Sequence, residues 1–235
     1  MIVQEEVEVI LMLCDYKVDG KEKCAEYVPT TAKPQLTFGP FTIKLLGTRK
    51  VEWQKRIYCD ATVNISSLEV QQDGKVMLTV NHYHWIAMPE RQPPPAIDYF
   101  PDPRQYKDKP RQPPIINTRP IELMKRLVTR DTKKPMVIHD SAGIGWTGFF
   151  VLTQVFLEVM AARKEFTSFD EHLSALRAQR FKAVETEAQY LYLHVMFVDY
   201  LQDASNLRVG AFIHEYDEYR SKLPPADKKE KTEER

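Results

Sequence analysis

One stretch of the sequence, residues 139–148, reads His139-Asp140-Ser141-Ala142-Gly143-Ile144-Gly145-Trp146-Thr147-Gly148. It joins the apolar run 136–138 to a long apolar segment, and it holds three of the chain's eight glycines. Glycines let successive backbone N–H groups turn inward, and the N-terminal end of a following helix adds partial positive charge. The pattern predicts a strand-to-helix turn that cradles an anion, although a turn that binds nothing would share it.

Apolar runs and turn signals before this stretch predict strands. The continuous run Val9–Leu13 is typical of a strand in the middle of a sheet. Three residue pairs favour turns: Asp19-Gly20, Gly39-Pro40 and Asp73-Gly74. Apolar and polar residues alternate after the second pair, where Ile43 and Leu45 are apolar, and after the third pair over residues 76–80, which predicts a strand in each place.

The C-terminal half has the pattern of helices. Apolar faces predict helices over residues 145–163, 168–179 and 186–201, and a shorter helix near Pro120 with Thr118 as its cap. Capping-box spacings run from Ser168 to Glu171 and from Thr186 to Gln189. Strands followed by helices predict an α/β layered domain, in which ligands bind at a strand-to-helix turn.

The composition excludes several classes of protein. The chain has 33 Lys and Arg against 33 Asp and Glu, so it lacks the cationic excess of a general nucleic-acid binder. Its cysteines, Cys14, Cys24 and Cys59, are widely spaced, which favours a reducing compartment and predicts no metal and no cofactor. The sequence shows neither a secretion signal nor a membrane-spanning segment, and we expect a cytoplasmic location.

Proline and charge set the expected domain limits. Ten of the 16 prolines lie between Pro89 and Pro120, which predicts an extended surface insertion over about residues 93–117. This insertion is either merely tolerated or a docking strip for a partner with an aromatic groove. We expect one domain over residues 1–223 and a charged, disordered tail over residues 224–235.

Residues 139–148 resemble the phosphate loop of the classical protein tyrosine phosphatases, His-Cys-Ser-Ala-Gly-Ile-Gly-Arg-Thr-Gly, at eight of ten positions. Other matches follow in the family's order as far as Leu201: Met12-Leu13, Lys23-Cys24, Tyr27, Pro29, Phe38-Gly39, Leu176-Arg177, Gln179-Arg180, Val184, Thr186, Gln189-Tyr190 and Tyr200-Leu201. The resemblance implies the family's fold, a central twisted mixed β-sheet flanked by helices.

The start of the chain departs from the family. Met1-Ile2 aligns with an internal Met-Ile, so the family's opening part, with the loop that stacks on the substrate ring, is expected to be missing. We therefore expect an unpaired sheet edge and exposed apolar surface. Either the chain is a fragment of a longer protein, or a partner covers that surface.

Two departures fall in the phosphate loop itself. Asp140 stands where the family has the cysteine that attacks phosphorus, and Trp146 stands where it has the arginine that grips phosphate. In a nest of N–H donors the Asp140 carboxylate would be held as an anion, so we expect it to occupy the cradle itself. Rival interpretations make Asp140 a new nucleophile, or the loop a phosphotyrosine-binding site without turnover.

Two more departures affect the family's acid and water-positioning residues. The mobile Trp-Pro-Asp loop aligns with Met88-Pro89-Glu90, in which Glu90 keeps a carboxyl that can protonate a leaving group. Glu185 replaces the water-positioning glutamine and is expected to add negative charge beside a dianionic substrate. The family's second glutamine remains as Gln189.

The other loop positions have structural interpretations. We expect His139 to buttress the loop, the Thr147 hydroxyl to hydrogen-bond to it, and Cys24 to be buried in packing. Trp146 either plugs the emptied pocket or offers an exposed aromatic ring to a partner. The remaining phosphate-loop positions are Ser141, Ala142, Gly143, Ile144, Gly145 and Gly148.

The combined changes predict a phosphatase-like pseudoenzyme that acts by binding proteins rather than by catalysis. Its expected partner is a kinase, a phosphatase or a phosphotyrosine protein. The alternatives are a weak or unconventional protein tyrosine phosphatase and a truncated product without function.

Overall fold

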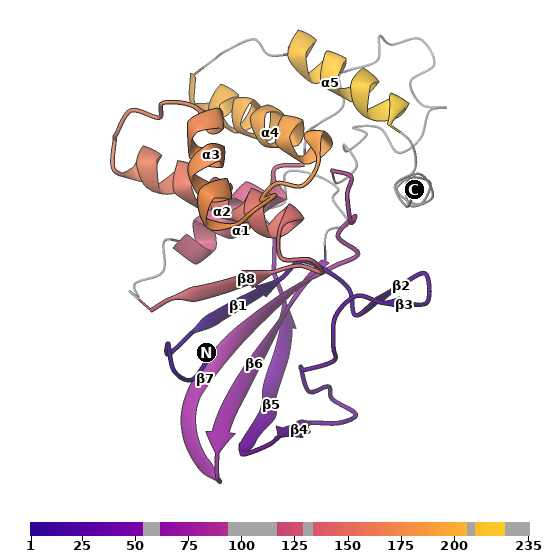
Figure 1. The fold of residues 1–235 in the computed structure, drawn as a ribbon, viewed down its shortest axis with the longest axis vertical. Helices are drawn as coiled ribbons and strands as arrows, with labels where there is room; N and C mark the ends of the chain where they lie inside the picture. Colours follow the sequence, from indigo (N-terminus) through magenta and orange to yellow (C-terminus); the bar gives the residue numbers. More distant parts are fainter. Residues whose placement is uncertain (54–61, 94–116, 129–133, 206–209, 224–235) are drawn as a thin grey trace. The chain divides into compact units, whose positions relative to one another are not determined.

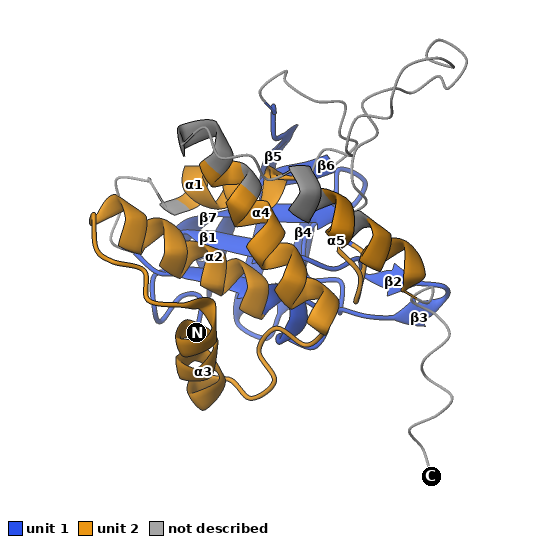
Figure 2. Ribbon diagram, turned by 90° about the horizontal axis from the view of Figure 1, so that it is seen from above, with its two compact units in different colours: residues 1–53, 61–88, 130–147 blue, residues 54–60, 89–129, 148–235 orange. Residues whose placement is uncertain are grey.

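The computed structural model describes residues 1–53, 62–93, 117–128, 134–205 and 210–223 (Figure 1). The chain divides into two compact units, which are coloured separately in Figure 2. The first comprises residues 1–53, 61–88 and 130–147, and the second residues 54–60, 89–129 and 148–235. Most of the predicted proline-rich insertion, the predicted tail and Cys59 lie outside the described residues.

The first unit contains a six-stranded mixed sheet in the order β4-β5-β6-β7-β1-β8 (Figure 1). Strands β4 to β7 pair antiparallel, whereas β1 pairs parallel with both β7 and β8. The bounds are β1 Val9–Met12, β4 Gln35–Phe38, β5 Phe41–Lys50, β6 Thr62–Gln72, β7 Lys75–Ile86 and β8 Met136–His139. A separate hairpin joins β2 Lys17–Val18 to β3 Lys21–Glu22. The predicted α/β class with a mixed sheet is confirmed.

The strand assignments follow from burial and from turn chemistry. All four residues of β1 are buried, as expected for a continuous apolar strand between two neighbours. Between β6 and β7, Asp73 has a φ of 48° and Gly74 a φ of 79°, the positive values that a two-residue hairpin turn requires. A core cluster of Val7, Ile10, Val70 and Val80 then covers part of this sheet.

The second unit is helical. Its helices are α1 Arg119–Val128, α3 Phe169–Gln179, α4 Glu187–Ser205 and α5 Gly210–Lys222, together with α2 Gly145–Ala161 from Gly148 onward. The four predicted helices are confirmed to within a few residues at their ends, whereas α5 was not predicted. The Ser168 hydroxyl accepts from the Glu171 N–H at 3.1 Å, which confirms the first predicted cap.

The second predicted cap is a complete capping box. The Thr186 hydroxyl accepts from the Gln189 N–H at 3.2 Å, and the Gln189 side-chain oxygen accepts from the Thr186 N–H at 3.3 Å. Two amide donors that the start of a helix would leave unsatisfied are therefore paired by side chains. This box fixes where α4 begins.

Aromatic rings join the helices of the second unit. The Phe156 ring of α2 lies 3.8 Å from the Phe197 ring of α4, centroid to centroid, and the Phe169 ring of α3 lies 5.2 Å from Phe197. Nearer the start of α2, Phe149 stacks on Tyr192 with centroids 5.3 Å apart. These contacts lie in the range of favourable aromatic pairs or closer, so α2, α3 and α4 share one core.

Gly148 is expected to be the position in α2 that tolerates substitution least. A Cβ atom there would lie 2.5 Å from the backbone nitrogen of Val184, and backbone cannot move aside cheaply. We expect Gly148→Ala to lower the free energy of unfolding by about 3 kcal/mol in urea titration. Gly47→Ala is the matched control, because nothing lies within 4 Å of its added Cβ. Equal destabilisation by both variants would contradict this packing.

Candidate functional site

The loop between β8 and α2 is closed by its own aspartate. Asp140 follows the last residue of β8, and α2 begins at Gly145. One carboxylate oxygen of Asp140 accepts from the Gly143 N–H, and the other accepts from the Thr147 N–H at 3.0 Å. Gly143 has a φ of 71°, a conformation that glycine adopts without strain. Two loop amides therefore point at the chain's own carboxylate.

Trp146 is buried in the first turn of α2. Its relative exposure is 2%, so the interpretation of Trp146 as an exposed aromatic ring for a partner is wrong. An indole carries one N–H donor and no positive charge. The loop position that would require a guanidinium for phosphate recognition therefore holds a neutral, buried side chain.

Two hydroxyls of the loop have different surroundings. The Ser141 hydroxyl donates to the backbone oxygen of Lys23 at 3.2 Å. The Thr147 hydroxyl is buried and has no hydrogen-bond partner among the described residues, so the expectation that it bonds to the loop is wrong. A buried hydroxyl without a partner costs stability.

His139 belongs to a buried network beneath the loop. The Tyr27 hydroxyl lies 2.7 Å from Nε2 of His139 and 2.7 Å from Nε2 of His82. Burial lowers the pKa of His139, and burial together with the neighbouring histidines lowers the pKa of His82 to about 3. Both rings are neutral at pH 7, and Tyr27 bridges them from the side of the sheet.

The second unit contains Glu90, Glu185 and Gln189. Glu185 accepts from the Arg91 guanidinium at 2.6 Å. A cation from the part of the chain that follows Glu90 therefore pairs with this carboxylate, and the expectation that Glu185 adds negative charge beside a substrate stays a prediction. The pair is half-exposed on the arginine side, so it contributes little to stability.

The backbone next to Glu90 is held by the start of α4. The Gln189 side-chain N–H donates to the Glu90 backbone oxygen at 3.5 Å, and the Thr186 hydroxyl donates to the Arg91 backbone oxygen at 3.1 Å. The capping box therefore has a second role: it attaches this loop to a helix. Asp140 and Trp146 lie in the first unit.

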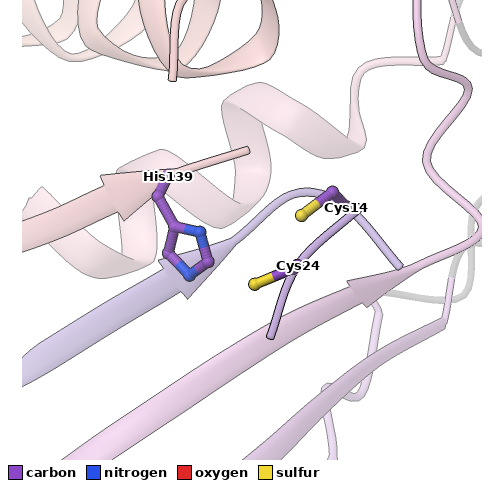
Figure 3. Close-up of side chains that lie close together, drawn as sticks. All are labelled: Cys14, Cys24 and His139. Carbon is purple, nitrogen blue, oxygen red and sulfur yellow. The ribbon is translucent and has the colours of Figure 1, made fainter. Parts of the chain in front are cut away.

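A cluster of metal-binding side chains was missed from the sequence. Ligand atoms of Cys14, Cys24 and His139 all lie within 4.8 Å of one another (Figure 3). Cys14 is buried, but Cys24 is only half-buried, so the expectation of a fully buried Cys24 is wrong. Burial raises the pKa of the Cys14 thiol to about 12 and also raises that of Cys24. No linear spacing signals this cluster, because its residues come from three segments.

The comparison with family models decides the class of the protein. A model described as protein-tyrosine phosphatase matches residues 1–199. The chain belongs to this family. The matched region includes the loop at residues 139–148. The family's mixed-sheet α/β fold, expected from the resemblance, is confirmed.

Curated phosphatases cover most of the chain at modest identity. The rat and human tyrosine-protein phosphatases non-receptor type 7 are each 29% identical to it over 194 residues, 83% of this chain. The rat phosphatidylinositol phosphatase PTPRQ is 25% identical over 215 residues, 91% of this chain. The chain spans 45% of the length of the first two relatives and 8% of the third.

Solved phosphatase structures share the fold. A structure of PTPN18 described as its fingerprint on distinct HER2 tyrosine phosphorylation sites matches with a TM-score of 0.63 and 22% identity, covering 85% of this chain and 62% of that one. PTPN18 in complex with HER2-pY1196 phosphopeptides matches with a TM-score of 0.64 and 21% identity, covering 85% and 60%. Among the described residues, no helix combines the length and apolar character needed to cross a membrane.

Proposed function

We propose that this phosphatase-family chain is catalytically inactive and acts by binding proteins in phosphotyrosine signalling. The observation that carries the proposal is the position of the Asp140 carboxylate, which accepts hydrogen bonds from the Gly143 and Thr147 amides. In the family these loop amides face the phosphate. Asp140 takes the place of the ligand as well as the place of the nucleophile.

The charge of the loop supports the same proposal. A phosphate dianion that approached the loop would meet the Asp140 carboxylate and would find no guanidinium at position 146, where Trp146 is buried and neutral. Like charges repel, and the N–H donors are already used by a charged acceptor. A loop of this kind loses both the chemistry and most of the affinity for phosphate.

The acid loop supports the proposal from the second unit. Its backbone is tied to the start of α4 through Gln189 and Thr186, and Arg91 is paired with Glu185. In the family this loop closes over substrate, which requires it to move. Glu185 replaces the glutamine that positions the attacking water, and in this chain its carboxylate serves as a partner for Arg91.

A protein partner follows from the family and the sequence. One PTPN18 structure contains HER2 phosphopeptides, and another concerns HER2 tyrosine phosphorylation sites. We therefore propose phosphotyrosine proteins, or the kinases and phosphatases that act on them, as partners of this chain. The proline-rich segment is the proposed docking strip for a partner with an aromatic groove. The cysteine usage of the sequence supports a cytoplasmic location for this interaction.

Tungstate binding tests the occupied loop. Tungstate mimics phosphate, and a ligand that binds only the native state raises the melting temperature. We expect no shift for the wild type and a rise of several degrees for Asp140→Cys/Trp146→Arg at saturating tungstate. Asp140→Cys alone, which leaves Trp146 in its buried position, keeps the test valid should the double variant fail to fold.

Two controls complete the tungstate experiment. Asp140→Asn keeps the size of the side chain and removes its charge, so it separates repulsion from occupation of the amides. Gly47→Ala is expected to melt like the wild type with and without tungstate. Gly47 is distant from the loop in the sequence, and nothing lies within 4 Å of a Cβ atom added there. A wild-type shift as large as that of the substituted loops would overturn the proposal.

A further inference from the structure

Three side chains that can bind a transition metal converge in the first unit. Cys14 lies two residues after β1, Cys24 two residues after β3, and His139 is the last residue of β8. Their ligand atoms all lie within 4.8 Å of one another, and Figure 3 shows the two sulfur atoms on the same side of the His139 ring. Two thiols and an imidazole within this distance are a donor set, not only a packing cluster.

We propose that Cys14, Cys24 and His139 bind a zinc ion, whose fourth position is left to water. Sulfur and imidazole nitrogen are the donors that Zn²⁺ prefers, and three protein ligands with one open position are typical of non-structural zinc sites. Mg²⁺ and Ca²⁺ prefer oxygen ligands, so two sulfur atoms and an imidazole nitrogen do not suit them. The site shares His139, the first residue of the phosphate loop, whereas Cys14 and Cys24 lie outside that loop.

The geometry requires only a small adjustment. Donor atoms around a tetrahedral zinc ion with Zn–S bonds of about 2.3 Å lie roughly 3.8 Å apart. Ligand atoms that already lie within 4.8 Å of one another need to approach by only about 1 Å to reach this separation. The ion would thus join three segments that are already neighbours.

The backbone beside each ligand is already fixed by hydrogen bonds. The Leu13 N–H donates to the His139 carbonyl at 2.9 Å, which ties the residue before Cys14 to the residue that carries the imidazole. The Cys24 N–H donates to the Tyr16 carbonyl at 3.3 Å, which brings the end of the β2–β3 hairpin back toward β1. The three ligands therefore come from anchored positions rather than from a loose loop.

The imidazole also has a partner that orients it. The Tyr27 hydroxyl lies 2.7 Å from His139 Nε2, and Tyr27 is held in turn by His82 at 2.7 Å. Histidines that bind metals are commonly oriented by such an outer hydrogen bond. His82 and His84 lie nearby, but neither belongs to the set of converging ligand atoms.

A cavity adjoins two of the three ligands. Cys24 and His139, together with Tyr27, are among the residues that line this cavity of about 600 Å³, and its other lining residues are apolar. Cys24 is half-buried, so one thiol can be reached from outside while Cys14 remains buried. The open fourth position of the ion is expected to be filled by water from this cavity.

Cobalt titration of the full-length, chelator-stripped and reduced protein tests the site. Co²⁺ reports tetrahedral thiolate ligation by visible d–d bands and a near-ultraviolet thiolate-to-metal charge-transfer band. We expect one equivalent of Co²⁺ to produce both bands and Zn²⁺ to bleach them. Cys14→Ser and Cys24→Ser are each expected to abolish most of the charge transfer and to weaken zinc binding by about 100-fold or more.

Matched controls separate this site from adventitious binding. Cys59→Ser removes the third cysteine of the sequence and should leave both the bands and the zinc affinity unchanged. His139→Gln should weaken zinc binding while it keeps the thiolate charge transfer. Absence of the charge-transfer band in the folded wild type, or bands that persist in both Cys14→Ser and Cys24→Ser, would overturn the proposal.

Thiol protection provides a second measurement on the wild type alone, in case a serine variant does not fold. Addition of zinc should slow the alkylation of the half-buried Cys24, and peptide mass spectrometry assigns the modified site. Equal alkylation of Cys24 with and without zinc in the folded protein would count against the proposal.

Discussion

Purified wild-type protein is expected to release phosphate from an aryl phosphate no faster than the buffer blank. An enzyme that works through a covalent intermediate loses roughly six orders of magnitude in rate when its nucleophile is removed. Loss of a charge-matched contact to the transition state costs about two more. Asp140 and Trp146 change both groups at once, and the Asp140 carboxylate is held by loop amides instead of facing a substrate.

The measurement is continuous hydrolysis of a fluorogenic aryl phosphate, with the human non-receptor type 7 phosphatase as the active standard. Asp140→Ala and Glu90→Ala are expected to match the wild type, since neither residue contributes to a reaction that does not occur. Hydrolysis above the blank that disappears in Asp140→Ala would instead identify an aspartyl nucleophile. Hydrolysis that disappears only in Glu90→Ala would indicate an enzyme of unconventional mechanism. Either result would end the pseudoenzyme proposal.

Acid is expected to destabilise the protein strongly through His82. Burial and the neighbouring His84 and His139 lower the pKa of His82 from 6.5 to about 3, and its ring contacts the Tyr27 hydroxyl. Below pH 6.5 the unfolded chain binds a proton at His82, whereas the folded chain stays neutral until near pH 3. The stabilising effect of the neutral ring is therefore complete above pH 6.5 and is lost as the pH falls toward 3, at about 1.4 kcal/mol per pH unit.

Urea unfolding at a series of pH values between 7 and 4.5 measures this loss. His82→Gln keeps a polar group near the position of Nε2 but cannot titrate, so the fall in stability with pH should become shallower by about one proton. His214→Gln is the matched control for a histidine substitution at the surface, because the His214 side chain is 66% exposed on α5. An unchanged slope in His82→Gln would contradict the assignment to His82. His84 and His139, whose pKa values burial also lowers, are expected to contribute to the slope that remains.

Much of the fold could be predicted from local sequence patterns. Helix starts at Ser168 and Thr186 were predictable because a cap pairs donors only two or three residues away along the chain. The hairpin at Asp73-Gly74 was predictable for the same reason, since its turn depends on two residues that accept positive φ. Helix α5 escaped prediction because no comparable cap or regular apolar face marks residues 210–222.

The features of the candidate site that could be predicted were likewise those that depend on short stretches of sequence. The sequence alone indicated the family, because a loop motif is contiguous and can be read residue by residue, and the same comparison proposed Asp140, Trp146, Glu90 and Glu185 as altered positions. It also suggested that Asp140 would be held by its own loop, since both partners lie within seven positions of it. These inferences need only short stretches of chain.

Contacts between distant segments were decided by the tertiary structure. The pairing of Glu185 with Arg91, the burial of Trp146 and the meeting of Cys14, Cys24 and His139 depend on which strands and helices become neighbours. Strand order places β1 beside β8, which brings Cys14 close to His139 although more than a hundred residues separate them in the sequence. Local propensity does not encode this order, because it arises from the burial of apolar surface by the whole chain.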